Sequence, residues 1–117
     1  MIVAGCDVGS LTSKAVLMKD GRMLESHVIK SKARPWESAE VVMGEVLKRA
    51  GISRSDVGYC VATGYGRSKI EFADEAVSEI ACHGKGARWL LPTARTVIDI
   101  GGQDCKALRL DARGDME

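Results

Sequence analysis

The stretch "DVGSLTSKAVLMKDGRMLESHVIK", residues 7–30, predicts how the fold begins. It continues an apolar run that starts at residue 2, so we expect a buried strand over residues 2–8 that ends in a glycine turn. Strands over residues 14–19 and 22–30 flank Asp20-Gly21, a dipeptide typical of two-residue hairpin turns. The chain is therefore predicted to open with a three-stranded antiparallel meander.

The rest of the chain alternates helices and strands. Pro35 stands at the start of an expected helix over residues 36–50, whose apolar residues recur at helical spacing, and Gly51 follows as its cap. The later elements, in order, are expected to be a strand over 57–62, a glycine-rich loop over 62–68, a helix over 74–91, and strands over 95–100 and 104–110.

This order, βββαβα and then ββ, predicts an α/β fold with a ribonuclease-H-like mixed sheet. The last two strands resemble the first hairpin of a second such lobe. We expect residues 1–94 to form the first lobe with an inter-lobe helix, and residues 95–117 to begin the second, incomplete lobe.

Composition narrows the function classes. The net charge of +1 and an aromatic content of 4% give no basic field or stacking platform for nucleic acid. No apolar run approaches the roughly 20 residues that span a membrane, and the N-terminus lacks the basic region of a signal peptide. The four cysteines form no C-x-x-C pair, so we expect reduced thiols in a cytoplasmic protein.

One turn motif, Asp-x-Gly, occurs twice in the sequence. "DVGSLTSKAV", residues 7–16, and "DIGGQDCKAL", residues 99–108, each follow an apolar run and match in register at Asp7/Asp99, Gly9/Gly101, Lys14/Lys106 and Ala15/Ala107. Two such turns at equivalent points of a repeated fold could clamp a nucleotide tail from both sides. The alternative is that each hairpin needs its glycine for geometry alone.

The residue types of both turns suit phosphate and magnesium. Backbone N–H groups of a glycine turn can point at an anion, and Asp7 could hold Mg²⁺ directly or through water. Ser10, Thr12 and Ser13 add hydroxyl donors, and Lys14 adds a charge. The second turn supplies the corresponding set, which comprises Asp99, Gly101, Gly102, Gln103 and Asp104.

Three further residues are candidates on the intervening segment. Glu79 could reach the cleft and orient water around the metal, and His83 shares its helix face at four-residue spacing. Arg67 could bind an anion or a partner. The alternatives are a solvated helix face for Glu79 and His83 and a surface loop for Arg67.

Four motifs in this order resemble one known family: "DVGSLTSKAVLMKDG", "ATGYGR", "SEIACHGKGA" and "RTVIDIGGQDCK". They are similar to the ATPase activators of 2-hydroxyacyl-CoA dehydratases and to the ATPase subunits of benzoyl-CoA reductase. Both are BadF/BadG/BcrA/BcrD-type ATPases of the actin, Hsp70 and acetate kinase superfamily. The resemblance covers almost the whole chain and matches the N-terminal portion of the family.

The resemblance implies two lobes around a cleft for ATP and Mg²⁺. Asp7, Gly9, Ser10, Thr12, Ser13 and Lys14 fall on the first phosphate motif, and residues 99, 101–104 on the second. Glu79 falls where the superfamily keeps a residue that orients the attacking water. We expect Asp7, Glu79, Asp99 and Gln103 to act in catalysis, with Mg²⁺ held at Asp7 and Asp99.

The resemblance also implies partners. Family members are homodimers or paired subunits that share one [4Fe-4S] cluster, and ATP hydrolysis drives a low-potential electron into a dehydratase or reductase component. None of the four cysteines here falls on a cluster-ligand position, and the adenosine motif is not among the motifs present. We therefore expect part of an activator, as a fragment or a split subunit; the alternatives are a small-molecule kinase fragment and a non-catalytic interaction module.

Overall fold

The computed structural model describes residues 1–101, 105–113 and 115–116. Two compact units divide the chain, Met1–Ala76 and Val77–Glu117. Helix α2 (Glu79–Leu90) belongs to the second of these units, whereas the sequence placed it with the first lobe. The expected lobe boundary after residue 94 stays a prediction about a larger fold.

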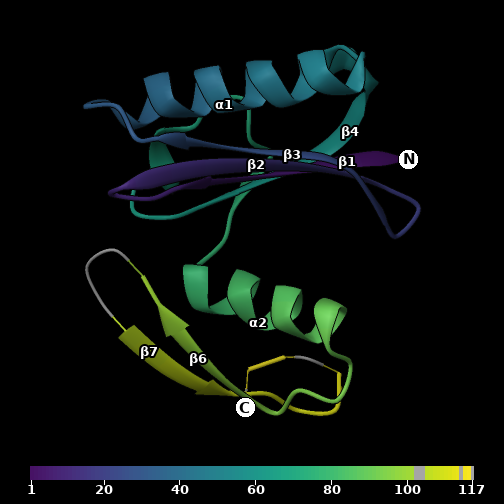
Figure 1. Cartoon of the computed structure of the whole chain (residues 1–117), viewed down its shortest axis with the longest axis vertical. Coiled ribbons are helices and arrows are strands. Elements are labelled where there is room, and N and C mark those ends of the chain that lie inside the picture. Colours follow the sequence, from purple (N-terminus) through teal and green to yellow (C-terminus); the bar gives the residue numbers. More distant parts are fainter. Residues whose placement is uncertain (102–104, 114, 117) are drawn as a thin grey trace. The chain divides into compact units, whose positions relative to one another are not determined.

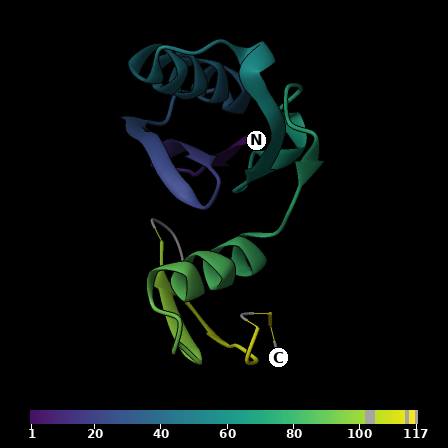
Figure 2. The same ribbon diagram turned by 90° about the vertical axis from the view of Figure 1, so that its right-hand side faces the viewer.

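The first unit is built on a five-stranded mixed sheet in the order β3-β2-β1-β4-β5. Its strands are β1 (Ile2–Val8), β2 (Thr12–Lys19), β3 (Arg22–Lys30), β4 (Val57–Thr63) and β5 (Glu75–Ala76). The first three pair antiparallel, and β4 pairs parallel with both β1 and β5. Figure 2 shows β3 and β5 at opposite edges of this sheet. The predicted meander and mixed sheet are confirmed.

Local signals set the hairpin and the first helix. Asp20 and Gly21 both have positive φ, 50° and 79°, as a two-residue turn matched to strand twist requires. Helix α1 (Pro35–Ala50) begins with proline at its first turn, where no N–H is needed, and ends at Gly51 with φ 71°. Figure 1 shows α1 lying along one face of the sheet.

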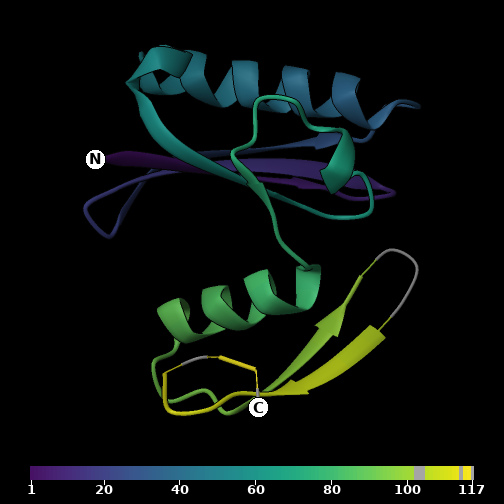
Figure 3. The same ribbon diagram turned by 180° about the vertical axis from the view of Figure 1, so that it is seen from behind.

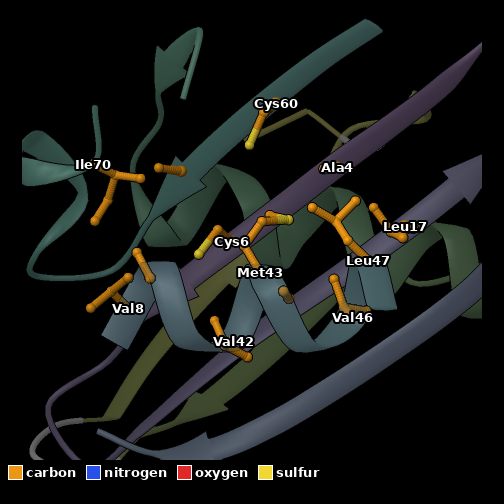
Figure 4. Close-up of a cluster of buried hydrophobic side chains, with 13 residues drawn as sticks. Ala4, Cys6, Val8, Leu17, Val42, Met43, Val46, Leu47, Cys60 and Ile70 are labelled. Atoms are coloured by element: carbon orange, nitrogen blue, oxygen red, sulfur yellow. The ribbon is translucent and has the colours of Figure 1, made fainter. Parts of the chain in front are cut away.

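The core lies between α1 and the sheet. One helix face contributes five buried residues: Ala39, Val42, Met43, Val46 and Leu47. The sheet contributes alternate residues of β1, β2 and β4, including Cys6, Val8, Leu17 and Cys60, as Figure 4 shows. Since alternate strand residues point to opposite faces, this core fixes which side chains lie on the other face of the sheet.

The second predicted helix begins later than expected. Residues 75–76 form β5 instead, because Asp74 is held at β4: its N–H donates to Cys60 O (2.8 Å) and its Oδ2 accepts from Cys60 N–H (2.7 Å). The helix starts at Glu79, and the Ser78 hydroxyl accepts from Ala81 N–H as its cap. The predicted start at residue 74 is therefore wrong by five residues, while the predicted end before Pro92 is close to the observed one at Leu90.

The second unit joins α2 to an antiparallel hairpin of β6 (Thr96–Ile100) and β7 (Cys105–Arg109), both visible in Figure 3. Arg88 of α2 donates to the carbonyls of Ala94, Asp111 and Ala112. On β6, Ile98 and Ile100 are 68% and 78% exposed.

Across the described residues, no helix has the length and hydropathy needed to cross a bilayer.

Candidate functional site

Asp7 lies near the end of β1 on the sheet face opposite α1. Its chain neighbours Cys6 and Val8 are buried in the core, so the alternation of the strand turns Asp7 the other way. Its cross-strand partner on β2 is Lys14, whose Nζ lies 3.5 Å from Asp7 Oδ2. The Asp7 side chain keeps 22% of its surface exposed, so its carboxylate remains accessible beside a cation.

The turn after β1 leaves room only for glycine at position 9. Gly9 N–H donates to Thr12 O at 3.0 Å, and a Cβ on Gly9 would lie 2.7 Å from that same oxygen. Ser10 and Leu11 at the tip are exposed. The Gly9 N–H is therefore used inside the turn, and Ser10 and Leu11 form the exposed tip that follows Asp7 along the chain.

Two serines support this turn from within. Ser13 is fully buried, and its hydroxyl lies 2.8 Å from the Ser31 hydroxyl, which donates to Gly9 O at 2.6 Å. Ser13, expected to contact phosphate, is thus placed as a support of the turn. Ser31 was missed by the sequence reasoning, because a lone serine at the end of a strand carries no signal of a long-range contact.

The glycine-rich loop after β4 closes on the same strand end. Gly64 has φ 94°, and a Cβ there would lie 2.2 Å from Val8 O and 2.8 Å from Asp7 Oδ1. Arg67 Nη1 donates to Gly64 O at 3.1 Å. Arg67 therefore stabilises the loop through this hydrogen bond. The sequence predicts for it an anion or partner ligand, or a surface-loop residue, and does not predict this role. The paired Gly-x-Gly of "ATGYGR" was the available signal that this loop approaches another backbone closely.

The second unit carries a matching hairpin. Asp99 and Lys106 are cross-strand partners on β6 and β7, just as Asp7 and Lys14 are on β1 and β2. The register match seen in the sequence is thus a structural match. Of the remaining predicted residues of this turn, Gly101 is exposed after β6, and Gly102, Gln103 and Asp104 lie outside the described residues.

Helix α2 presents two polar side chains to this hairpin. His83 Nδ1 lies 2.5 Å from Asp99 Oδ2, and Glu79 Oε2 lies 4.0 Å from Lys106 Nζ. An ionised carboxylate only accepts, so Nδ1 of His83 carries the proton of this hydrogen bond. The structure therefore brings Glu79, His83, Asp99 and Lys106 together within the second unit. Sequence spacing found the shared helix face but not its partners.

The buried cysteines are inert. Burial raises the pKa of the Cys6 thiol to about 12 and that of Cys60 to about 11, so both stay protonated at neutral pH. All four cysteines are free thiols, with Cys82 half-buried and Cys105 exposed.

Within the described residues no three His, Cys, Asp or Glu side chains are grouped as a metal site would need.

The residues at the end of β1 fit a magnesium-bound polyphosphate. Mg²⁺ takes oxygen ligands and is usually bound in proteins by one or two carboxylates, a role that Asp7 can fill. The exposed tip of the turn, at Ser10 and Leu11, is accessible to phosphate, and Lys14 adds a positive charge beside Asp7. In the second unit Asp99 and Lys106 share this register, but they contact His83 and Glu79, respectively.

Comparison with known proteins gives a family match over nearly the whole chain. The model of the BadF/BadG/BcrA/BcrD ATPase family matches residues 4–117. This chain belongs to that family. The predicted family resemblance is thus confirmed.

Relatives within the BadF/BadG/BcrA/BcrD family include two curated proteins. The activator of lactoyl-CoA dehydratase from Anaerotignum propionicum is 44% identical over 117 residues, which are all of this chain and 45% of that protein. A benzoyl-CoA reductase subunit from Thauera aromatica is 35% identical over 121 residues, covering 99% of this chain and 43% of that protein. The chain thus spans less than half the length of these relatives.

A solved member of the family has the same fold. The activator of the 2-hydroxyisocaproyl-CoA dehydratase from Clostridium difficile, with bound ADPNP, superposes with a TM-score of 0.91 at 38% identity. The match covers 99% of this chain and 43% of that one. It confirms the predicted fold class, and it shows that the family binds an ATP analogue.

Proposed function

We propose that this chain is the N-terminal part of an ATP-hydrolysing activator that drives low-potential electron transfer. Its target would be a 2-hydroxyacyl-CoA dehydratase or a benzoyl-CoA reductase. The observation that carries the proposal is the repeated Asp/Lys register, Asp7 with Lys14 and Asp99 with Lys106, in a chain of this ATPase family. The names of the relatives supply the class of partner.

The chain's own residues would act by positioning charge. Asp7 and Asp99 would hold Mg²⁺, directly or through water, and the turns that begin at Gly9 and Gly101 would bind phosphate oxygens. Mg²⁺, when bound, supplies neutralisation of the negative charge on the phosphates. Lys14 stands beside Asp7 and adds to that positive field.

The remaining predicted groups complete this machinery. Glu79 would orient the attacking water, and Lys106 Nζ lies 4.0 Å from its Oε2 within the second unit. His83 holds Asp99 through its Nδ1–H. Ser10 and Thr12, together with Gly102, Gln103 and Asp104, would line the phosphates as their motifs imply.

The proposal extends to assembly and place. As a member of its family the protein would work in the cytoplasm as a homodimer or paired subunit. A [4Fe-4S] cluster would be held by cysteines outside this sequence. The four free thiols, two of them buried, support the proposal of a reducing compartment. Neither nucleic acid nor membrane is expected as a partner.

The test is ATP hydrolysis by the natural full-length protein. Asp7→Asn and Asp99→Asn remove one carboxylate charge each and should lower the rate of phosphate release by at least about 100-fold, in line with the loss of a group that stabilises the transition state. Asp20→Asn is the matched control, because Asp20 sits in an exposed turn where asparagine is equally suitable.

The products separate the alternatives. Free phosphate supports the activator, whereas a phosphorylated small molecule would identify a kinase of the same fold. Nucleotide binding or partner binding without turnover in the wild type would identify an interaction module. Unchanged hydrolysis in both aspartate variants would refute the assigned roles.

A further inference from the structure

Thr63, the last residue of β4, has a buried hydroxyl that no described residue hydrogen-bonds. The residue is 7% exposed, and Oγ1 has no hydrogen-bond partner among the described residues. Leaving a buried hydroxyl unsatisfied costs about 1–3 kcal/mol. Valine has nearly the same shape without that cost, so packing alone does not explain a threonine at this position.

The position of Thr63 connects it with the proposed magnesium site. Thr63 and Asp7 are partners in the parallel pairing of β4 with β1. Cys60 and Ala62 lie in the core under α1, so Thr63 points to the other face, which is the face of Asp7. The two polar side chains therefore stand side by side on adjacent strands.

The loop that follows strengthens this link. The position of a Cβ on Gly64 is 2.8 Å from Asp7 Oδ1, so the carboxylate extends toward the residue directly after Thr63. The Gly64 backbone is also pressed against Val8 O. Strand pairing and loop closure together place Thr63, Gly64 and Asp7 next to one another.

We propose that the Thr63 hydroxyl is a further binding group of the Asp7 site, satisfied by an oxygen of the magnesium nucleotide. The inference rests on the proposed function and names a residue that the phosphate motifs do not include. The hydroxyl donates to a water of the Mg²⁺ shell or to a phosphate oxygen. Its unsatisfied state without ligand is the cost of a preorganised donor.

Two substitutions test this in the natural full-length protein. Thr63→Val removes the hydroxyl and keeps the shape, and Thr63→Ser keeps the hydroxyl. The Kd for ADPNP is measured by calorimetry with Mg²⁺ and again with EDTA, and unfolding without nucleotide is followed in urea. We expect Thr63→Val to raise the Kd of Mg-ADPNP about 10- to 100-fold, the usual scale for a hydrogen bond to a charged group, and to leave stability unchanged or higher.

The outcomes are distinct. Thr63→Ser should stay within about 3-fold of the wild-type Kd because it keeps the donor. A Thr63→Val loss that disappears in EDTA assigns the hydroxyl to the Mg²⁺ shell, and a loss that persists assigns it to phosphate. A wild-type Kd in Thr63→Val, or a marked loss of its stability, overturns the proposal. A wild-type protein that binds no Mg-ADPNP refutes the proposed function itself.

Discussion

Gly64→Ala tests whether the close approach of the loop to β1 holds the Asp7 carboxylate in place. The substitution adds one methyl group at a residue with φ 94°, a conformation that alanine adopts at a cost of about 1–2 kcal/mol. The added Cβ would also lie 2.2 Å from Val8 O. This neighbour is backbone, so the strand end or the loop has to shift, which adds about 1–3 kcal/mol.

Gly51→Ala is the matched control. Gly51 caps α1 with φ 71°, and a Cβ there meets nothing within 4 Å. Its cost should therefore be the dihedral cost alone, about 1–2 kcal/mol. Gly64→Ala should cost about 2–5 kcal/mol by adding the two contributions.

Urea unfolding of the natural full-length protein gives the free energy of unfolding of both variants. Calorimetry gives their Kd for Mg-ADPNP, which reports the effect at Asp7. We expect Gly64→Ala to be less stable than Gly51→Ala and to bind Mg-ADPNP more weakly, whereas Gly51→Ala binds as the wild type does. Equal destabilisation of the two variants would refute the steric argument. A larger loss for Gly64→Ala with unchanged nucleotide affinity would refute the link to Asp7.

Three further predictions concern the core, the turn and the second unit. Because the Cys6 and Cys60 pKa values are raised by burial, the folded state keeps protons that the unfolded chain releases above pH 9. The free energy of unfolding should therefore fall between pH 9 and about pH 11, by up to about 1.4 kcal/mol per pH unit for each thiol. Urea titrations at each pH measure this slope, and the double substitution Cys6→Ala, Cys60→Ala should flatten it. Ser31→Ala removes the donor to Gly9 O and leaves buried Ser13 without that contact, so it should cost about 1–3 kcal/mol in urea, and adding Ser13→Ala should recover part of the loss. Arg88→Ala removes the donors to three carbonyl groups, including those of Asp111 and Ala112, so hydrogen exchange of the backbone amides in residues 110–113 should become faster. Arg113→Ala is the control: this side chain is exposed, and its loss should leave the exchange rates of that segment unchanged.

Sequence reasoning succeeded where the signal is local. Asp20-Gly21 predicted its turn because few dipeptides adopt two positive φ values, and Pro35 and Gly51 predicted the ends of α1 for similar reasons. It failed at the start of α2, where helical periodicity suggested residue 74. There the hydrogen bonds of Asp74 to Cys60, a strand away, turn the chain into β5.

The sequence by itself determined the family, the order of most elements, and the two Asp-x-Gly turns with their Asp/Lys pairs, because these depend on residues close together in the chain. The tertiary structure alone decided which distant groups meet. Ser31 at the end of β3 donates to Gly9 at the end of β1, across the intervening β2. Gly64 approaches Val8 of β1 closely, and His83 pairs with Asp99. Such contacts are set by strand register and by packing against the core, and no spacing along the chain records them.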